Sequence, residues 1–135
     1  MKLEPIGPDA LLAQFHKFLQ SWEQHDLVAR HALFDARVSV EDPVGEPPRR
    51  GVEALEASWS ALPEHNATVR ATLVRFIVGG NEALAHYRLL FTPPGSAAVT
   101  CDRYDLLEFG QDLLIRRVRA FADSGTVLVH HRGVD

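Results

Sequence analysis

The residue of this sequence best placed to do chemistry is Asp42, which ends the short extended segment Val38–Asp42. Residues 38, 40 and 42 share one face of an extended chain, and residues 39 and 41 share the other. The two valines indicate that the first face points inward, so Asp42 enters an apolar space while Glu41 stays in water. Desolvation disfavours the charged form of a carboxyl group and therefore raises its pKa. Such a carboxylate is suited to abstract a proton from carbon or from water.

A second interpretation of Asp42 needs no chemistry. An aspartate directly before a proline is common at turns, and Pro43 ends the strand because it lacks a backbone donor. The spacing alone leaves both interpretations open, a general base or a turn residue.

Other reactive side chains form weaker patterns. The seven histidines show no ligand spacing within one element, and the neighbours His130 and His131 point opposite ways in an extended chain. Because a metal site needs three or four convergent ligands, we expect no metal ion. Nothing marks Cys101 as an activated nucleophile. Gly79-Gly80 is typical of a hairpin turn rather than of a phosphate-binding loop, so we expect no cofactor.

Three helices are predicted in the first half of the chain. Apolar residues recur at steps of three and four from Asp9 to about His25, which is one stripe of an α-helix. A second helix is predicted at about Leu27–Phe34 and a third at about Val52–Leu62. The segment Val44–Gly51 contains two prolines and two glycines and is predicted to be a loop.

Beyond residue 68 the apolar period changes from that of a helix to that of a strand. Four strands separated by turn-forming residues are predicted at about Thr68–Val78, Glu82–Thr92, Val99–Phe109 and Leu113–Ala122. Strands in this order are consistent with an antiparallel meander. Helices followed by strands predict an α+β fold, with the helices gathered on one face of the sheet.

Several of these strands are apolar on both faces. In one of them Ala83 and Leu89 lie on one side, and Leu84 and Leu90 lie on the other. A sheet covered by helices on one face should carry water-facing residues on its second face. The excess of apolar residues predicts a homodimer through the sheet. The alternative is a strongly curled sheet that covers more of itself.

The composition limits the class of protein and its partners. With 135 residues and no internal repeat, residues 1–135 are expected to form a single domain. A net charge of −4 argues against nucleic acid or an anionic membrane as partner. No apolar run approaches the ~20 residues of a membrane span, and the first residues do not resemble a signal peptide. Together with the single cysteine, this indicates a cytoplasmic protein.

The segments around Asp42 resemble the ketosteroid isomerase family. The sequence reads Ala32-Leu33-Phe34, then Val40-Glu41-Asp42-Pro43-Val44-Gly45, then Pro48-Arg49-Arg50-Gly51. In that family a helix ends in Leu-Phe, a strand ends in Glu-Asp-Pro-Val-Gly, and a Pro-Arg loop opens the third helix. The family belongs to the nuclear transport factor 2-like superfamily, also called polyketide cyclase-like. The resemblance covers nearly the whole chain in the order and length of its elements.

This resemblance implies a cone-shaped, curved antiparallel sheet packed on three N-terminal helices. It also implies a reaction of the steroid delta-isomerase type, in which Asp42 is the general base that shifts a proton alpha to a ketone of a hydrophobic substrate. Asp105 matches the second aspartate of the family, which stays protonated and donates a hydrogen bond to the developing enolate oxygen. Arg103 lies two residues back on the same face and would hold Asp105 ionised. The alternative for Asp105 is therefore an ordinary salt bridge.

At the position of the family's catalytic tyrosine, this sequence has Phe18, which has no hydroxyl group. Trp59 matches a second family aromatic, and its indole can donate a hydrogen bond. Other candidates for the missing donor are Tyr87, His86 and Tyr104. The residues expected to bind the substrate are Phe18, Trp22, Trp59 and Val118.

Three functions remain open at this point. The first is an isomerase with Asp42 as base and Asp105 as hydrogen-bond donor. The second is another enzyme on the same fold, a polyketide-type cyclase or an epoxide hydrolase; the hydrolase would use Asp42 with Asp102, Arg103 or Asp105 to activate water. The third is a non-catalytic binder of hydrophobic small molecules. The fold alone cannot decide between them, because one scaffold supports many functions.

Overall fold

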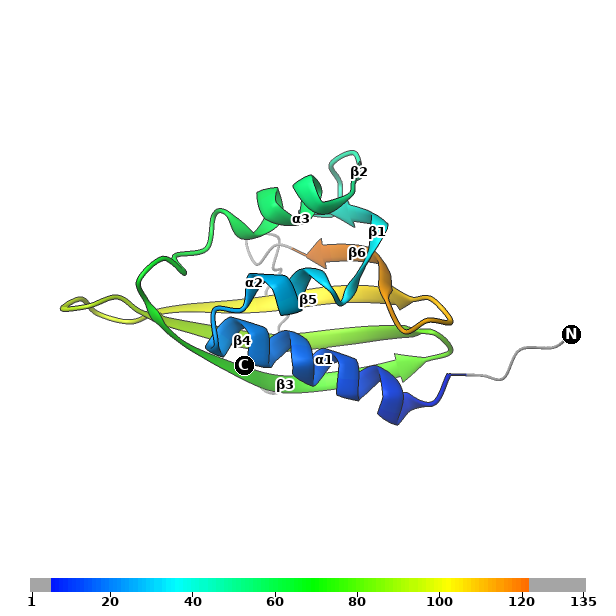
Figure 1. The fold of residues 1–135 in the computed structure, drawn as a ribbon, viewed down its shortest axis with the longest axis horizontal. Coiled ribbons are helices and arrows are strands. Elements are labelled where there is room, and N and C mark those ends of the chain that lie inside the picture. The colour runs from blue at the N-terminus through cyan, green and yellow to red at the C-terminus, as the bar shows by residue number, and fades with distance from the viewer. Residues whose placement is uncertain (1–5, 122–135) are drawn as a thin grey trace, which may run out of the picture.

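The computed structural model describes residues 6–121 of the chain and shows helices followed by a curved sheet (Figure 1). The helices are α1 (Pro8–Glu23), α2 (Leu27–His31) and α3 (Val52–Trp59). The strands are β1 (Phe34–Glu41), β2 (Arg49–Arg50), β3 (Thr68–Gly79), β4 (Glu82–Thr92), β5 (Val99–Phe109) and β6 (Ile115–Phe121). The predicted α+β class is confirmed.

The strands form one sheet in the order β2-β1-β6-β5-β4-β3. Strands β3 to β6 make the predicted antiparallel meander. Strand β1, however, runs parallel to β6, with Val40 opposite Val118 and Glu41 opposite Arg119. The sheet is therefore mixed, and the prediction of an antiparallel sheet needs this correction. A long connection through α3 and the meander separates β1 from β6, and parallel neighbours require such a crossover.

The predicted boundary between the second helix and the first strand also differs. Helix α2 ends at His31, and β1 begins at Phe34, because the chain here pairs with β6 instead of continuing the helix. The Ile115 amide donates to the carbonyl oxygen of Leu33 at 2.9 Å, and Phe34 lies opposite Ile115. The last residue of the final predicted strand, Ala122, lies outside the described residues.

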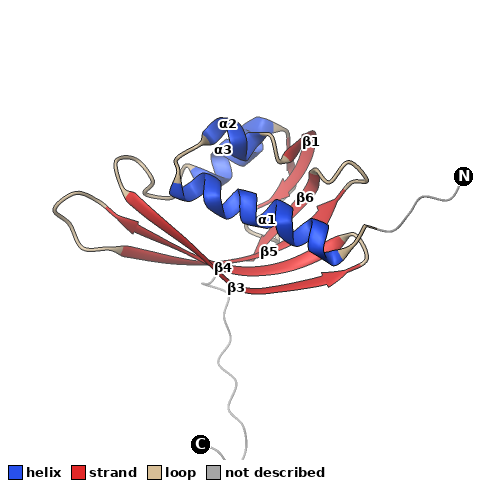
Figure 2. Cartoon of the chain, turned by 60° about the horizontal axis from the view of Figure 1, so that its bottom comes forward, coloured by secondary structure: helices blue, strands red, loops and turns tan. Residues whose placement is uncertain are grey.

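All three helices lie on one face of the sheet (Figure 2). The apolar stripe predicted for the first helix is buried there: Leu11, Phe15, Phe18, Leu19 and Trp22 are each at most 6% exposed. These side chains join the inward residues of the strands in one core. The core therefore lies between the helices and the inner face of the sheet, and the site is built there.

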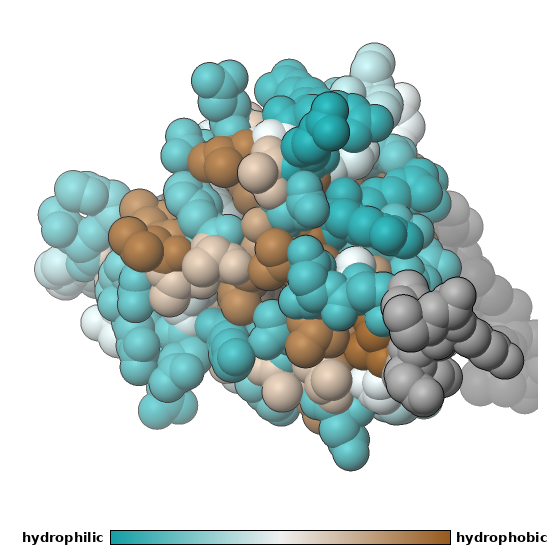
Figure 3. Space-filling view, turned by 45° about the vertical axis from the view of Figure 1, so that its right-hand side comes forward, coloured by the Kyte–Doolittle hydropathy of each residue, from teal (hydrophilic) through white to brown (hydrophobic). Residues whose placement is uncertain are grey.

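The outer face of the sheet carries no helix among the described residues. As predicted, β4 is apolar on both sides, with Ala83 buried at 1% exposure and Leu84 exposed at 47%. Apolar patches reach the molecular surface between hydrophilic residues (Figure 3). Within residues 6–121, no helix combines the length and the apolar character needed to cross a membrane.

Candidate functional site

Strand β1 alternates as the sequence predicted. Val38 and Val40 face the core at 0% and 4% exposure. On the opposite face, the Glu41 carboxylate pairs with Arg117 at 3.2 Å and with Arg119 at 3.5 Å. Asp42 follows directly on the inner face, where a cis peptide bond joins it to Pro43. The alternation thus separates two adjacent carboxylates onto opposite faces of the sheet.

The Asp42 carboxylate is held by polar partners rather than by an apolar wall. Its Oδ2 atom accepts hydrogen bonds from the Ser58 hydroxyl of α3 and from Arg103 Nη2 of β5, the latter at 3.3 Å. The side chain is 21% exposed. The sequence predicted an apolar environment because the valines of β1 are visible in the sequence, whereas Ser58 and Arg103 come from other elements. Both partners donate to the same carboxylate oxygen, and Oδ1 of Asp42 has no hydrogen bond among the described residues.

Asp105 lies on the inner face of β5 and is only 3% exposed. Its Oδ2 atom accepts a hydrogen bond from the Tyr87 hydroxyl at 2.7 Å, and its buried Oδ1 atom has no partner among the described residues. Burial raises the pKa of Asp105 above its ordinary value, and this effect outweighs Arg103 and the Tyr87 hydrogen bond, which lower it. Burial therefore shifts the equilibrium of Asp105 toward the neutral carboxyl group, whose proton on Oδ1 would be available for donation.

Arg103 interacts electrostatically with both carboxyl groups. Burial alone would lower its pKa, but the nearby Tyr87, Asp105 and Asp42 raise the pKa of Arg103 above its ordinary value. The guanidinium is thus firmly cationic. Its hydrogen bond goes to Asp42, while Asp105 bonds to Tyr87. The two aspartates therefore differ in partners, and only Asp42 is directly paired with a positive charge.

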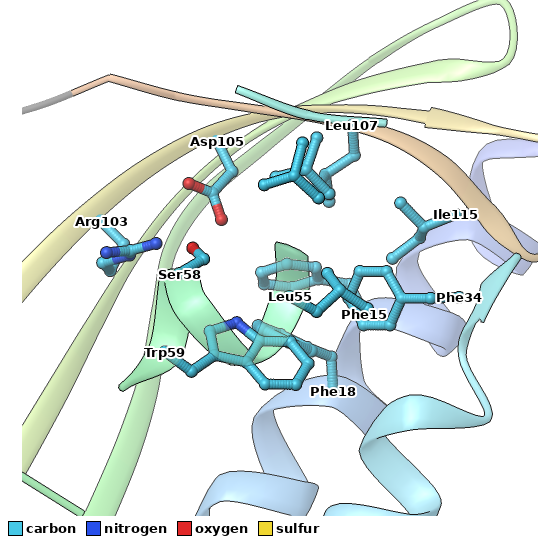
Figure 4. Close-up of a pocket in the computed structure, with 12 residues that line it drawn as sticks. Phe15, Phe18, Phe34, Leu55, Ser58, Trp59, Arg103, Asp105, Leu107 and Ile115 are labelled. Atoms are coloured by element: carbon cyan, nitrogen blue, oxygen red, sulfur yellow. The ribbon is translucent and has the colours of Figure 1, made fainter. Parts of the chain in front are cut away.

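Next to these groups is a narrow pocket, partly open to solvent, whose cavity volume is only about 10 Å³, roughly the room that one water molecule needs. Apolar and aromatic side chains form most of its wall, and Ser58, Arg103 and Asp105 provide polar atoms along one side (Figure 4). The lining residues are Phe15, Phe18, Phe34, Val40, Leu55, Ser58, Trp59, Arg103, Asp105, Leu107, Ile115 and Val118. A mostly apolar cavity with a few convergent polar groups is typical of a small-molecule site.

Asp42 itself lines a second, more polar hollow between α3 and the segment after β1. Glu46 and Arg49 also line this hollow, and Val40 and Ser58 line both spaces. Asp42 therefore stands at the junction, separated from the apolar pocket by Ser58 and Arg103. This position differs from the sequence prediction, which placed Asp42 in the apolar space itself.

The structure brings several of the predicted substrate-binding residues together. Phe18, Trp59 and Val118 line the apolar pocket. Trp22 does not line it; it is 1% exposed and packs beneath Arg30, whose guanidinium carbon lies 3.6 Å from the centre of the indole ring. Among residues 6–121, no group of three or more His, Cys, Asp or Glu side chains is arranged to hold a metal ion.

Three other residues considered from the sequence lie on the outer face of the sheet. His86 Nε2 is 2.9 Å from Asp102 Oδ1 and its ring stacks on Tyr104. The hydrogen bond with His86 lowers the pKa of Asp102 below its ordinary value. These residues lie across the sheet from the pocket, so they do not supply the missing donor. Tyr87 lies on the inner face but gives its hydroxyl proton to Asp105.

Two side chains that shape the site and its surroundings were not found from the sequence. Ser58 lies three residues after Leu55, so helical periodicity alone would have placed both on the inner face of α3. The other feature is fully buried Arg30, which donates to Ser21 and forms two hydrogen bonds to Glu64, at 3.1 and 2.7 Å. No local pattern distinguishes this arginine from an exposed one.

Solved structures with the same fold have low sequence identity to this chain. SalBIII, an epoxide hydrolase/cyclase-like enzyme in pyran ring formation of the polyether salinomycin, is 18% identical with a TM-score of 0.68, over 84% of this chain and 90% of that chain. Delta 5-3-ketosteroid isomerase from Mycobacterium sp. is 20% identical with a TM-score of 0.67, over 85% and 94%. RV0760c from Mycobacterium tuberculosis, in complex with estradiol-17beta-hemisuccinate, is 17% identical with a TM-score of 0.66, over 84% and 94%.

These similarities show that the chain shares the fold of these proteins, which include a ketosteroid isomerase, as the sequence resemblance implied. The family follows from the sequence comparison. The SnoaL-like domain matches residues 15–118, and the chain therefore belongs to the SnoaL-like family. No curated protein sequence matches the chain.

Proposed function

We propose that this protein is an enzyme that transfers a proton on a flat, mostly apolar substrate bearing a ketone, a reaction of the steroid delta-isomerase type. Asp42 is the general base and neutral Asp105 is the hydrogen-bond donor to the ketone oxygen. The substrate extends from the apolar pocket, where its oxygen lies beside Asp105, to the junction at Ser58 where Asp42 stands. The cavity is small in this structure, so its aromatic walls must move apart to admit a flat ring system.

The observation that carries this proposal is the hydrogen bonding of Asp105. One oxygen of Asp105 accepts the hydrogen bond from Tyr87, and the other is buried without a partner among the described residues. The side chain of Asp105 points into the pocket (Figure 4). An unsatisfied buried polar atom is costly unless a ligand satisfies it. A neutral donor aimed at a cavity is suited to stabilise negative charge that develops on a substrate oxygen.

The proposed reaction conserves all atoms. Asp42 removes a proton from the carbon alpha to the ketone, and the C–H electron pair moves into the new C=C bond of the enolate. The enolate oxygen accepts a hydrogen bond from Asp105. The substrate also carries a C=C bond between its β and γ carbons. Asp42 then returns the proton to the γ carbon, where the π pair of that bond forms the new C–H bond. The C=O bond reforms, and the remaining α–β double bond is conjugated with it.

Opening of an epoxide by water is a second candidate, and the position of Asp42 favours it. The carboxylate is held by Arg103 and Ser58 and faces the polar hollow, where water has access to it. Asp42 would remove a proton from the water as it attacks carbon, and neutral Asp105 would protonate the leaving epoxide oxygen. The similarity to SalBIII, described as epoxide hydrolase/cyclase-like, agrees with this candidate.

The proposed function is tested by comparing the wild-type protein with Asp42→Asn on a 5-ene-3-ketosteroid and on an apolar epoxide. Glu41→Gln is the matched control, because it neutralises the neighbouring carboxylate on the opposite face. We expect Asp42→Asn to lower the rate on one of the two substrates by about 10²–10⁴-fold, as for loss of a general base, while Glu41→Gln retains the rate. Equal measurable rates for all three proteins would contradict catalysis by Asp42. No conversion of either substrate by the wild type would leave a non-catalytic binder of hydrophobic molecules.

We further propose that the single domain forms a homodimer through the outer face of its sheet. Exposed apolar side chains pair across strands there, with Ile77 opposite Leu84 and Tyr104 opposite Phe121. A contiguous exposed patch of this kind marks an interaction surface. Charges of both signs flank it, including the Arg88–Asp102 pair at 3.1 Å, so two copies related by a twofold axis can be complementary. A cytoplasmic location also remains a proposal.

A further inference from the structure

One donor is missing from the proposed site. Stabilisation of an oxyanion commonly uses more than one hydrogen bond, and Asp105 supplies one. The family's tyrosine is replaced by Phe18, and the Tyr87 hydroxyl is engaged by Asp105. A second donor, if the site has one, must come from another side chain on the pocket wall.

Trp59 meets this requirement. It lines the apolar pocket together with Ser58 and Asp105, and the edge of its indole that carries the nitrogen points toward these two residues (Figure 4). None of the hydrogen bonds among the described residues uses this nitrogen. An indole N–H can only donate, so the group is suited to a ligand that brings an acceptor.

The Trp59 ring is held in this orientation by its neighbours. His31 stacks on it with a centroid distance of 5.7 Å and an angle of 16° between the planes. Phe34 and Trp22 meet it edge to face at 5.6 and 5.9 Å. The buried Arg30 guanidinium lies 5.2 Å from its ring centre. A ring packed on several sides keeps its N–H direction fixed, which is the preorganisation that charge stabilisation requires.

We propose that Trp59 Nε1 donates a second hydrogen bond to the substrate oxygen beside Asp105. This inference rests on the proposed function, because the acceptor is the oxygen that Asp105 also binds. It assigns the role of the missing tyrosine to a residue on α3, whereas Phe18 on α1 remains an apolar wall. The ligand class is an apolar molecule with one oxygen that becomes negative during the reaction.

Nuclear magnetic resonance of the two indole N–H groups tests this inference on the full-length protein. The chain has two tryptophans, and spectra of Trp22→Phe and Trp59→Phe assign the signals. The probe is estradiol, a flat phenol whose oxygen imitates an enolate, with its binding measured separately by calorimetry. We expect the Trp59 N–H signal to move downfield on binding, while the signal of Trp22, buried outside the pocket, moves much less.

The outcomes separate the inference from the proposed function. Estradiol that binds without moving the Trp59 signal contradicts the inference alone. Estradiol that does not bind contradicts both the inference and the proposed ligand class. In kinetics, we expect Trp59→Phe to lower kcat about tenfold with a smaller change in KM, and Trp59→His, which restores an N–H donor, to recover part of the loss. A packing role alone would not produce recovery by histidine.

Discussion

The two aspartates of the site differ because their partners differ. Asp42 accepts hydrogen bonds from Ser58 and cationic Arg103, whereas Asp105 is buried and accepts one from Tyr87. Pairs of carboxyl groups in different surroundings are a common basis of acid–base catalysis. In the proposed mechanism Asp42, next to Arg103, takes a proton and Asp105, whose pKa is raised by burial, donates a hydrogen bond.

Substitution of Asp105 distinguishes a neutral donor from a carboxylate. Asparagine keeps the shape of the side chain and can still donate a hydrogen bond, so we expect Asp105→Asn to lose less than about tenfold in kcat. Alanine removes the donor, and we expect Asp105→Ala to lose about 10²–10³-fold. Steady-state kinetics on the substrate that the wild type converts measures both. Equal losses for the two variants would mean that Asp105 acts through a negative charge.

The raised pKa of Asp105 also has a consequence for stability. Because the pKa is higher in the folded chain than in the unfolded chain, the stabilisation is fully present below the unfolded pKa, ~3.9, and is lost as pH rises through the folded pKa. Asp105→Asn does not titrate. We therefore expect the unfolding midpoint of the wild type to fall relative to that of Asp105→Asn as pH rises from about 4 to 8. A constant difference over this range would show that the pKa of Asp105 is the same in both states.

The elements that carry the site come from distant parts of the chain. Asp42 follows β1, Ser58 lies on α3, and Arg103 and Asp105 lie on β5. Alternation within a strand is local, so the sequence was sufficient to place Glu41 on the outer face and to predict the bounds of β4 and β5. The prediction that Glu41 stays in water was wrong, because its arginine partners leave it only 14% exposed, less than Asp42 at 21%. The hydrogen bonds to Asp42 and the parallel pairing of β1 with β6 depend on contacts between elements, and no local pattern encodes them.

The α1–α2 arrangement depends on the buried cation of Arg30. Its guanidinium donates to the Ser21 hydroxyl and carbonyl and to the Glu64 carboxylate, and it stacks on Trp22. Removal of one partner of a buried ion pair leaves the other uncompensated. We expect Arg30→Leu to lower the free energy of unfolding by about 3 kcal/mol, measured by urea denaturation. A loss below about 1 kcal/mol, as for a surface ion pair, would contradict a structural role.

The proposed homodimer uses the outer face of the sheet. Leu84 is 47% exposed on this face near the turn between β3 and β4, opposite Ile77 and Leu106 in the neighbouring strands. If a second copy of the chain covers Leu84, a glutamate at this position would be buried in the dimer without a positively charged partner. We therefore expect Leu84→Glu to convert a dimer into a monomer, measured by light scattering after gel filtration.

Val28→Glu is the control for that experiment. Val28 is 82% exposed on α2, on the helical side of the molecule, so a charge there leaves the outer sheet face unchanged. A wild type that is already monomeric at micromolar concentration would contradict the proposed dimer. Equal dissociation by both variants would mean that the interface lies elsewhere.

The catalytic proposal requires a protonated Asp105 beside an ionised Asp42 in the same folded protein. Infrared difference spectroscopy at neutral pH detects this state, because the C=O stretch of a protonated carboxyl group is separate from the bands of carboxylates. We expect the wild type to show a protonated-carboxyl band that persists in Asp42→Asn and disappears in Asp105→Asn. Absence of the band, or its loss in Asp42→Asn alone, would contradict the assignment of donor and base.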